Sequence, residues 1–233
     1  LHGVGLWEGH VFIRDRTDIE IHFMHSGFEQ LHKDVACYEK FLSLSTGQTG
    51  YPFVDACMRN LISEGWITFR MRAMLVSFAS YQLWIDWRLS GNHLAKLFTD
   101  FEPGIHFSQL QMQSGVTGIN AMRVYNPIKQ SIEHDPNGEF IKKWIPELKN
   151  IPIEFIHEPW KFQQNMLDES PVIIGQDYPL PIVDHELEAK NAKEKIYEVR
   201  KSKKFKHESR IIFKNHGSRK FKSKPKPRNI ITD

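Results

Sequence analysis

The sequence predicts an all-α fold, and three stretches of the chain carry this prediction. Residues 51–65 place apolar side chains at a spacing of about 3.6 residues, the period of an amphipathic helix. The next segment, residues 67–87, is more apolar and too long for a typical strand, so it is expected to form a helix deep in a helix-packed core. A further helix is expected from Asp184, a good amino-terminal cap, to about Lys204.

The other segments are assigned in chain order. Pro52 suits the first turn of the first helix, which is expected to end near Gly65. A shorter helix over residues 92–98 precedes residues 99–118, which are rich in Gly, Gln and Ser and are expected to form an irregular loop and a candidate site. Residues 137–145 predict another helix. Five later prolines predict an extended wrap over the surface: Pro152, Pro159, Pro171, Pro179 and Pro181.

The composition is typical of a soluble protein with one sizeable core or two small ones, since 40% of the 233 residues are hydrophobic. The most apolar run, residues 71–87, is interrupted by charged and amide side chains, so no membrane span is expected. The first residues carry no export signal, and Cys37 and Cys57 are too few for a disulfide framework. A cytoplasmic protein is therefore expected, and we expect it to be monomeric.

Charge is divided unevenly along the chain, whose formal net charge is +3. The stretch Arg200–Arg228 contains thirteen Lys or Arg residues and a single acid, Glu208, so it carries about +12 and the rest of the chain about −9. Polyanions would be attracted to this end. The stretch is either a solvated, disordered terminus or a contact for nucleic acid. The chain is accordingly divided into a helical domain, residues 1–205, and a basic tail, residues 206–233, that is expected to be disordered.

Common catalytic and metal-binding signatures are missing from the sequence. There is no phosphate-binding glycine loop followed by Lys, no Gly-x-Ser-x-Gly and no His-Glu-x-x-His. His22 and His25 have a spacing that would suit a metal on one helical face, but surface histidines are the more common source of such a pair. No metal site is predicted.

The most informative sequence is TGYPFVDACMRNLISEGWITFRMR at residues 49–72, followed by YQLWIDWR at residues 81–88. Photolyases and cryptochromes carry a TGxPxVDAxMRxLxxxGWxxxRxR block and then a DWR end to the following helix, and this chain resembles both with the same internal spacing. Further motifs resemble that family in the same order: RVYNP at 123–127, GEFIKKWIPEL at 138–148 and HEPW at 157–160. The resemblance implies a multi-helical photolyase/cryptochrome FAD-binding domain that is incomplete at its amino terminus.

The charged residues of these motifs agree with a flavin site. Arg72 would lie in the first turns of a buried helix, where a guanidinium is costly unless it meets an anion or a carboxylate. In the family the matching Arg faces the flavin diphosphate and ring edge, and Asp100 and Glu102 fall where two acids contact the ring edge and sugar hydroxyls. An ordinary ion pair that holds the loop to the helix is the alternative for Arg72. The resemblance thus implies FAD as the cofactor, bound by Arg72, Asp100, Glu102, His106 and Phe69.

Several positions depart from the family pattern. His106 stands where the family usually has Asn or a small residue facing the reactive flavin nitrogen, and an imidazole there could exchange a proton. Phe69 stands where many members have Asn. Trp87 matches the middle electron-transfer tryptophan, but Leu110 replaces the flavin-proximal one and cannot relay an electron. His106 and Trp87 are therefore the candidate catalytic residues. Other aromatic residues either offer a different route or simply pack the core: Trp84, Tyr81 and Trp66.

For the nucleic acid, the resemblance places Arg70 and Arg123 at backbone contacts around a flipped-out pyrimidine dimer, with Trp7 and Met112 as pocket walls. It implies a light-driven DNA repair lyase that acts on DNA with UV photoproducts, in which an electron from reduced FAD splits cyclobutane pyrimidine dimers. Two alternatives stay open. One is a cryptochrome-type blue-light photoreceptor, and the other is a DNA-binding remnant without flavin.

Overall fold

The computed structural model describes residues 37–118, 120–165 and 172–216, and within these ranges it contains helices and one isolated bridge, between Ile174 and Tyr178, but no strand. The elements are α3 (Cys37–Ser45), α4 (Pro52–Glu64), α5 (Phe69–Ser77), η2 (Phe78–Gln82), α6 (Trp87–Leu97), α7 (Pro103–Gln113), α8 (Pro127–His134), α9 (Glu139–Trp144), η3 (Pro146–Leu148), η4 (Ile153–Phe155), α10 (Pro159–Asn165), α11 (His185–Lys201) and α12 (Lys203–His216). The prediction of an all-α fold is confirmed.

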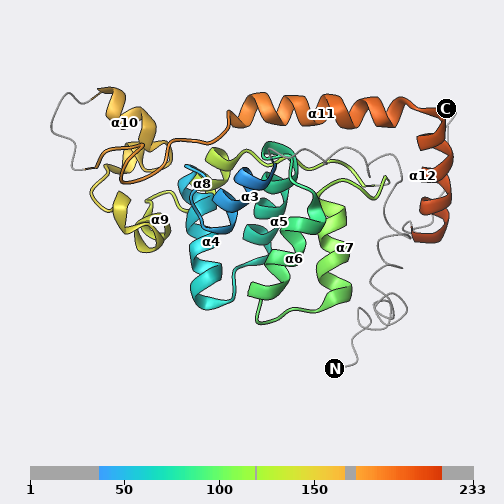
Figure 1. The fold of residues 1–233 in the computed structure, drawn as a ribbon, viewed down its shortest axis with the longest axis horizontal. Coiled ribbons are helices and arrows are strands. Elements are labelled where there is room, and N and C mark those ends of the chain that lie inside the picture. Colours follow the sequence, from blue (N-terminus) through green and yellow to red (C-terminus); the bar gives the residue numbers. More distant parts are fainter. Residues whose placement is uncertain (1–36, 119, 166–171, 217–233) are drawn as a thin grey trace, which may run out of the picture.

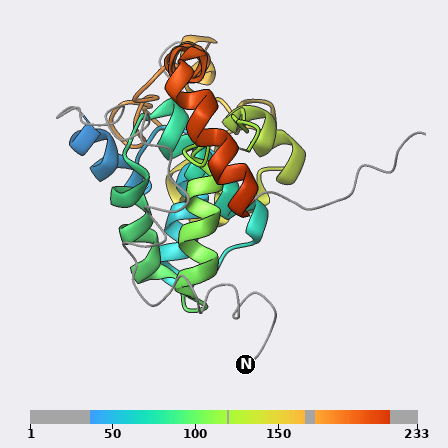
Figure 2. The ribbon, with the colours of Figure 1, turned by 90° about the vertical axis from the view of Figure 1, so that its right-hand side faces the viewer.

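Four helices form the centre of the molecule. They are α4, α5, α6 and α7, which lie side by side. Helix α11 lies across one end of these four helices (Figure 1). Figure 2 looks along α11 and shows α12 running down from its end. Helices α8, α9 and α10 lie at the other end of α11, and α4 packs against both α8 and α9.

Helices α4 and α9 form where the sequence predicts them. Pro52 occupies the first turn of α4, where a missing N–H costs nothing. Gly65 ends α4 with a φ of 70°, in the left-handed region that suits glycine. Helix α9 follows Gly138 and ends at Trp144, one residue before the end predicted at Ile145. Local signals at the helix ends were therefore sufficient to place both elements.

The apolar segment after Gly65 is not a single helix. Helix α5 continues into the π-helix η2, which ends at Gln82, and residues 83–86 leave the helical conformation. The Asp86 carboxylate then accepts a hydrogen bond of 2.7 Å from Arg88 N and caps α6. The prediction of one helix through residue 87 is wrong, and the DWR motif begins a helix instead of ending one. Helix α6 consequently starts five residues before the predicted helix at 92–98.

The prediction of an irregular loop over residues 99–118 is also wrong, because α7 occupies much of it. Glu102 caps this helix by accepting a hydrogen bond of 2.7 Å from Ile105 N, and Pro103 takes the first helical position. Helix α7 buries the polar side chains Gln111 and Gln113 beside its apolar ones. Burial of polar side chains removes the apolar stripe by which an amphipathic helix is normally found in a sequence.

The carboxy-terminal part contains two helices. Asp184 caps α11 as predicted, since its Oδ1 accepts hydrogen bonds from the backbone N–H groups of Glu186 and Leu187. Helix α11 ends at Lys201, and α12 follows directly. The proposed boundary between residues 205 and 206 falls inside α12. Residues 217–233 lie outside the described residues, so the disordered tail stays a prediction.

The proline-rich stretch from residue 152 to residue 181 combines extended and helical pieces. The short helix η4 follows Pro152, and Pro159 begins α10. Pro179 and Pro181 lie in the non-helical approach to α11, as the predicted wrap requires. Pro171 lies outside the described residues.

Gly50 allows this wrap to approach the start of α4. Its φ is +80°, and a Cβ added there would lie 2.3 Å from the carbonyl oxygen of Leu180. We expect Gly50→Ala to lower the free energy of unfolding by about 2 kcal/mol or more, because positive φ and overlap with backbone both penalise alanine. Denaturant unfolding followed by circular dichroism measures this loss. Gly175→Ala is the control, since Gly175 has a φ of +100° but its added Cβ would lie 3.7 Å from the nearest atom. Equal losses in both variants would contradict the role of backbone overlap.

Candidate functional site

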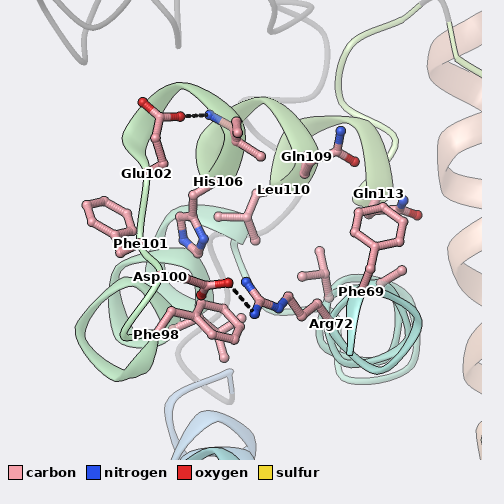
Figure 3. Close-up of a pocket in the computed structure, with 14 residues that line it drawn as sticks. Phe69, Arg72, Phe98, Asp100, Phe101, Glu102, His106, Gln109, Leu110 and Gln113 are labelled. Carbon is pink, nitrogen blue, oxygen red and sulfur yellow. Dashed lines mark hydrogen bonds and ion pairs between the residues drawn. The ribbon is translucent and has the colours of Figure 1, made fainter. Parts of the chain in front are cut away.

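A cavity of about 180 Å³ lies between helices α5, α6 and α7 (Figure 3). Its walls are mostly aliphatic and aromatic, and its polar groups come from α5, from the loop between α6 and α7, and from α7 itself. The structure brings together on these walls every residue that the sequence assigned to the cofactor: Phe69, Arg72, Asp100, Glu102 and His106. Their contact with a cofactor is still a prediction.

Arg72 is the cation of the cavity. Its Nη2 lies 2.8 Å from Asp100 Oδ2, and its Nε donates to the backbone oxygen of Ile67 at 3.0 Å. The guanidinium carbon lies 4.1 Å from the ring centre of Phe98. The structure therefore contains the ion pair between helix and loop that was the alternative interpretation of Arg72. These three contacts hold the guanidinium in one orientation beside the cavity, where its charge is available to an anionic ligand.

Asp100 and Glu102 lie on the loop that leads into α7. Asp100 pairs with Arg72, and its side chain is about half exposed. One oxygen of Glu102, Oε2, is committed to the amino-terminal cap of α7. The sequence did not predict this capping role. Glu102 thus positions the helix that carries His106, whatever else its carboxylate binds.

His106 is tied to α6 by one hydrogen bond, with 2.9 Å between its Nε2 and the backbone oxygen of Gly91. A carbonyl oxygen only accepts, so Nε2 carries the proton and the neutral ring has its lone pair on Nδ1. Burial lowers the pKa of His106 and the nearby Arg72 charge lowers it further, while the hydrogen bond to Gly91 opposes both. The imidazole is therefore neutral at pH 7.

This lowered pKa predicts a pH dependence of stability. The unfolded chain binds the proton of His106 more tightly than the folded protein does. The contribution of His106 to the unfolding free energy should therefore be complete above about pH 6.5 and fall as the pH drops below that value. Denaturant unfolding at pH 7.5 and 5.5 should show a larger loss for wild type than for His106→Asn. Equal losses would contradict the prediction, since the other titrating groups are common to both proteins.

Trp87, the electron-transfer tryptophan predicted from the sequence, and Leu110, which replaces the flavin-proximal one, differ in their position relative to the cavity. Trp87 is buried, with 2% of its surface exposed, but it is not a residue of the cavity wall. It precedes Gly91 by one turn of α6, and the guanidinium carbon of Arg88 lies 4.9 Å from its ring centre. Leu110, where the sequence lacks an aromatic residue, does line the cavity. Among the aromatic alternatives, Tyr81 and Trp84 are buried and Trp66 is exposed.

Of the residues assigned to DNA, the three that the structure describes lie outside the cavity wall. Arg70 on α5 and Arg123 in the segment before α8 are exposed, and Met112 on α7 is half-buried. The backbone oxygen of Arg123 accepts a hydrogen bond of 3.0 Å from Ser77 Oγ, which fixes this segment to the end of α5. Trp7 lies outside the described residues. Contact of these side chains with DNA stays a prediction.

Two polar residues of the cavity wall were not identified from the sequence. Gln109 and Gln113 occupy the same side of α7 as His106 and Leu110, at the helical spacing of three and four residues. That spacing is visible in the sequence. It becomes a signal only when residues 103–113 are recognised as a helix.

No group of three or more His, Cys, Asp or Glu side chains in the described ranges is placed to hold a metal ion. Of the helices that the structure describes, none combines the length and apolarity that crossing a membrane requires.

The fold is an all-α domain, and its cavity combines an oriented guanidinium with aromatic and aliphatic walls, a class of site that suits a flat ligand with anionic groups. Comparison with known proteins then identifies the family. The family model of the FAD binding domain of DNA photolyase matches residues 10–198, and the chain belongs to this family.

Relatives include both photolyases and cryptochromes. The chain is 39% identical over 152 residues to the deoxyribodipyrimidine photo-lyase of Alkalihalophilus pseudofirmus, covering 64% of this chain and 32% of that protein. It is 34% identical over 148 residues to cryptochrome DASH of Gloeobacter violaceus, covering 63% and 30%. A bacterial class III photolyase structure from Agrobacterium tumefaciens superposes with a TM-score of 0.72 at 28% identity, covering 83% of this chain and 40% of that one. The chain thus spans about a third of the length of the curated relatives described here.

The cavity residues fit the cofactor of this family. FAD combines an anionic diphosphate with a flat, mostly apolar ring that has polar edges. The cavity supplies an oriented guanidinium, aromatic and aliphatic walls, and carboxylates at one end. It also supplies two amide oxygens, from Gln109 and Gln113, that are buried and have no hydrogen-bond partner among the described residues. Buried polar atoms of this kind normally find a partner.

Proposed function

We propose that this chain belongs to a light-dependent DNA repair lyase and forms part of its FAD site. The observation that carries the proposal is the convergence of Arg72, Asp100 and His106 on one apolar-walled cavity. Family membership supports it independently. When bound, reduced FAD would supply the light-driven electron that opens the cyclobutane ring of a pyrimidine dimer, and would receive that electron back.

The residues of the chain have distinct tasks in this proposal. Arg72 attracts the anionic groups of the cofactor. The Asp100 carboxylate keeps the guanidinium in place and can also accept hydrogen bonds from N–H or O–H groups of the cofactor. The apolar walls exclude water from the ring, which strengthens each of these interactions. His106 presents a neutral imidazole whose Nδ1 can accept a hydrogen bond or a proton.

The same proposal assigns the exposed arginines to DNA. Arg70 and Arg123 would contact phosphates around a dimer that has left the stack, because electron transfer requires close approach to the lesion. Met112 would line the base pocket. Trp87 would carry electrons to the cofactor during its reduction, by a path that does not include Leu110.

Illumination provides the test. The protein that carries this chain should be loaded with FAD, reduced, and illuminated with an oligonucleotide that contains one cyclobutane pyrimidine dimer. The dimer should disappear in the light and persist in the dark, as measured by chromatography of the digested DNA. Persistence of the dimer in the illuminated, FAD-loaded protein would refute repair.

A blue-light photoreceptor of the cryptochrome type is the second candidate, and Leu110 favours it because an aliphatic wall residue alters the usual electron path. Relatives at similar identity also carry the name cryptochrome. A photoreceptor should change the protease sensitivity of residues 206–233 on illumination and bind damaged and undamaged DNA equally. If the purified protein shows no flavin absorption band after FAD is added and the unbound FAD is removed, both flavin functions fail and a DNA-binding remnant is left.

A further inference from the structure

Gln109 and Gln113 are polar residues of the cavity wall to which none of the roles above is assigned. They lie four residues apart on α7, toward the end of that helix away from Glu102 (Figure 3). Residues at this spacing have Cβ atoms about 5–6 Å apart on one side of a helix. Their amide groups can therefore contact the same small ligand.

The side-chain oxygens of both residues are buried. Within the described part of the chain, neither Gln109 Oε1 nor Gln113 Oε1 has a hydrogen-bond partner, and Gln113 as a whole is only 3% exposed. A buried amide oxygen without a partner is unfavourable, and native proteins contain few of them. Two such atoms on the wall of one cavity indicate that a ligand with hydrogen-bond donors completes them.

The rest of the wall restricts the chemistry of that ligand. Leu110 lies between the two glutamines in the sequence, and Phe69 and Val76 line the cavity from α5. Apolar and aromatic side chains favour a flat, unsaturated ring. A carboxamide offers an acceptor oxygen next to a donor NH2 group, and its complement is an imide edge, in which an N–H group lies next to a carbonyl. Gln and Asn recognise the edges of nucleobases by the same pairing.

We propose that Gln109 and Gln113 form a subsite that binds the imide edge of a heteroaromatic ring. Two sources carry this edge: the isoalloxazine ring of the flavin and a pyrimidine base. The inference rests on the proposed function, because it takes the cavity to be the place where flavin and damaged base meet. It adds two specificity-determining residues that the sequence motifs do not include.

The test replaces both amides with a side chain of similar length that cannot form these hydrogen bonds. Gln109→Met/Gln113→Met should weaken FAD binding roughly tenfold, as measured by titration of flavin fluorescence. The matched control is Gln130→Met on α8, because Gln130 Oε1 is also buried without a partner among the described residues but does not line this cavity. The control should bind FAD as wild type does.

A modified ligand keeps the test decisive if the double variant is less stable. Wild type should bind FAD methylated at the imide nitrogen about tenfold more weakly than FAD, and the double variant should not discriminate between the two. If FAD affinity is unchanged but the affinity for a dimer-containing oligonucleotide falls about tenfold, the subsite binds the base. Unchanged affinity for both ligands would overturn the subsite and leave the proposed function intact. Failure of wild type itself to bind FAD would refute the proposed function, and the subsite with it.

Discussion

Asp55→Ala should lower the free energy of unfolding by at least about 3 kcal/mol, the largest effect of a single substitution that we expect. Asp55 is fully buried, and its carboxylate accepts four hydrogen bonds, from the N–H and hydroxyl of Thr49, from Gly50 N and from the hydroxyl of Tyr178. Alanine would leave these donors buried without an acceptor. Denaturant unfolding of the two proteins measures the loss.

The pH of this measurement matters. Burial raises the pKa of Asp55 to about 6, although its hydrogen bonds to Tyr178, Thr49 and Gly50 oppose the rise. Unfolding should therefore be measured at pH 8, where the carboxylate is ionised and can accept all four bonds. Tyr178→Phe removes a single donor and should cost about 1 kcal/mol. A loss below about 1 kcal/mol for Asp55→Ala would contradict the central role of this carboxylate.

The same carboxylate ties the start of α4 to a part of the chain that is distant in sequence. Asp55 fixes residues 49–51 at the start of α4, and Tyr178 brings the distant wrap before α11 to the same point. The Tyr51 hydroxyl donates to the backbone oxygen of Val183 at 2.7 Å and adds a second tie. These polar contacts need particular residues at fixed spacing. The sequence did not show these contacts, and α4 and the cap of α11 were predicted correctly from the local signals of Pro52, Gly65 and Asp184.

Elements that depend on tertiary context were not predicted. Helix α7 was missed because its inner side mixes Gln109 and Gln113 with Leu110, so no apolar stripe marks it. The break before α6 was missed because Asp86 lies within an apolar run, where its capping role is seen only in the folded chain. The residues assigned to the cofactor came from the family resemblance and the spacing of its motifs. Their convergence on one cavity, and the capping task of Glu102, follow from α7 and needed the structure.

Arg72→Met should weaken FAD binding by about 10- to 100-fold, which corresponds to the roughly 1.5–3 kcal/mol of a hydrogen bond to a charged group. The guanidinium is the cation of the cavity wall, and its contacts with Asp100, Ile67 and Phe98 orient it before a ligand arrives. Methionine fills similar space without charge or donors. It also leaves Asp100 as an unbalanced negative charge that repels the diphosphate. Titration of flavin fluorescence measures the affinity.

Arg70→Met is the matched control, because it makes the same substitution two residues earlier on α5, where the side chain is exposed and outside the cavity wall. This control should bind FAD as wild type does but bind oligonucleotides more weakly at low salt, since a phosphate contact is lost. Asp100→Asn removes the partner of Arg72 and keeps the cation, so its effect on FAD affinity should be smaller than that of Arg72→Met. Equal FAD affinity in Arg72→Met and Arg70→Met would show that the Arg72 charge does not bind the cofactor. The Arg72–Asp100 pair would then serve only to hold the loop before α7 against α5.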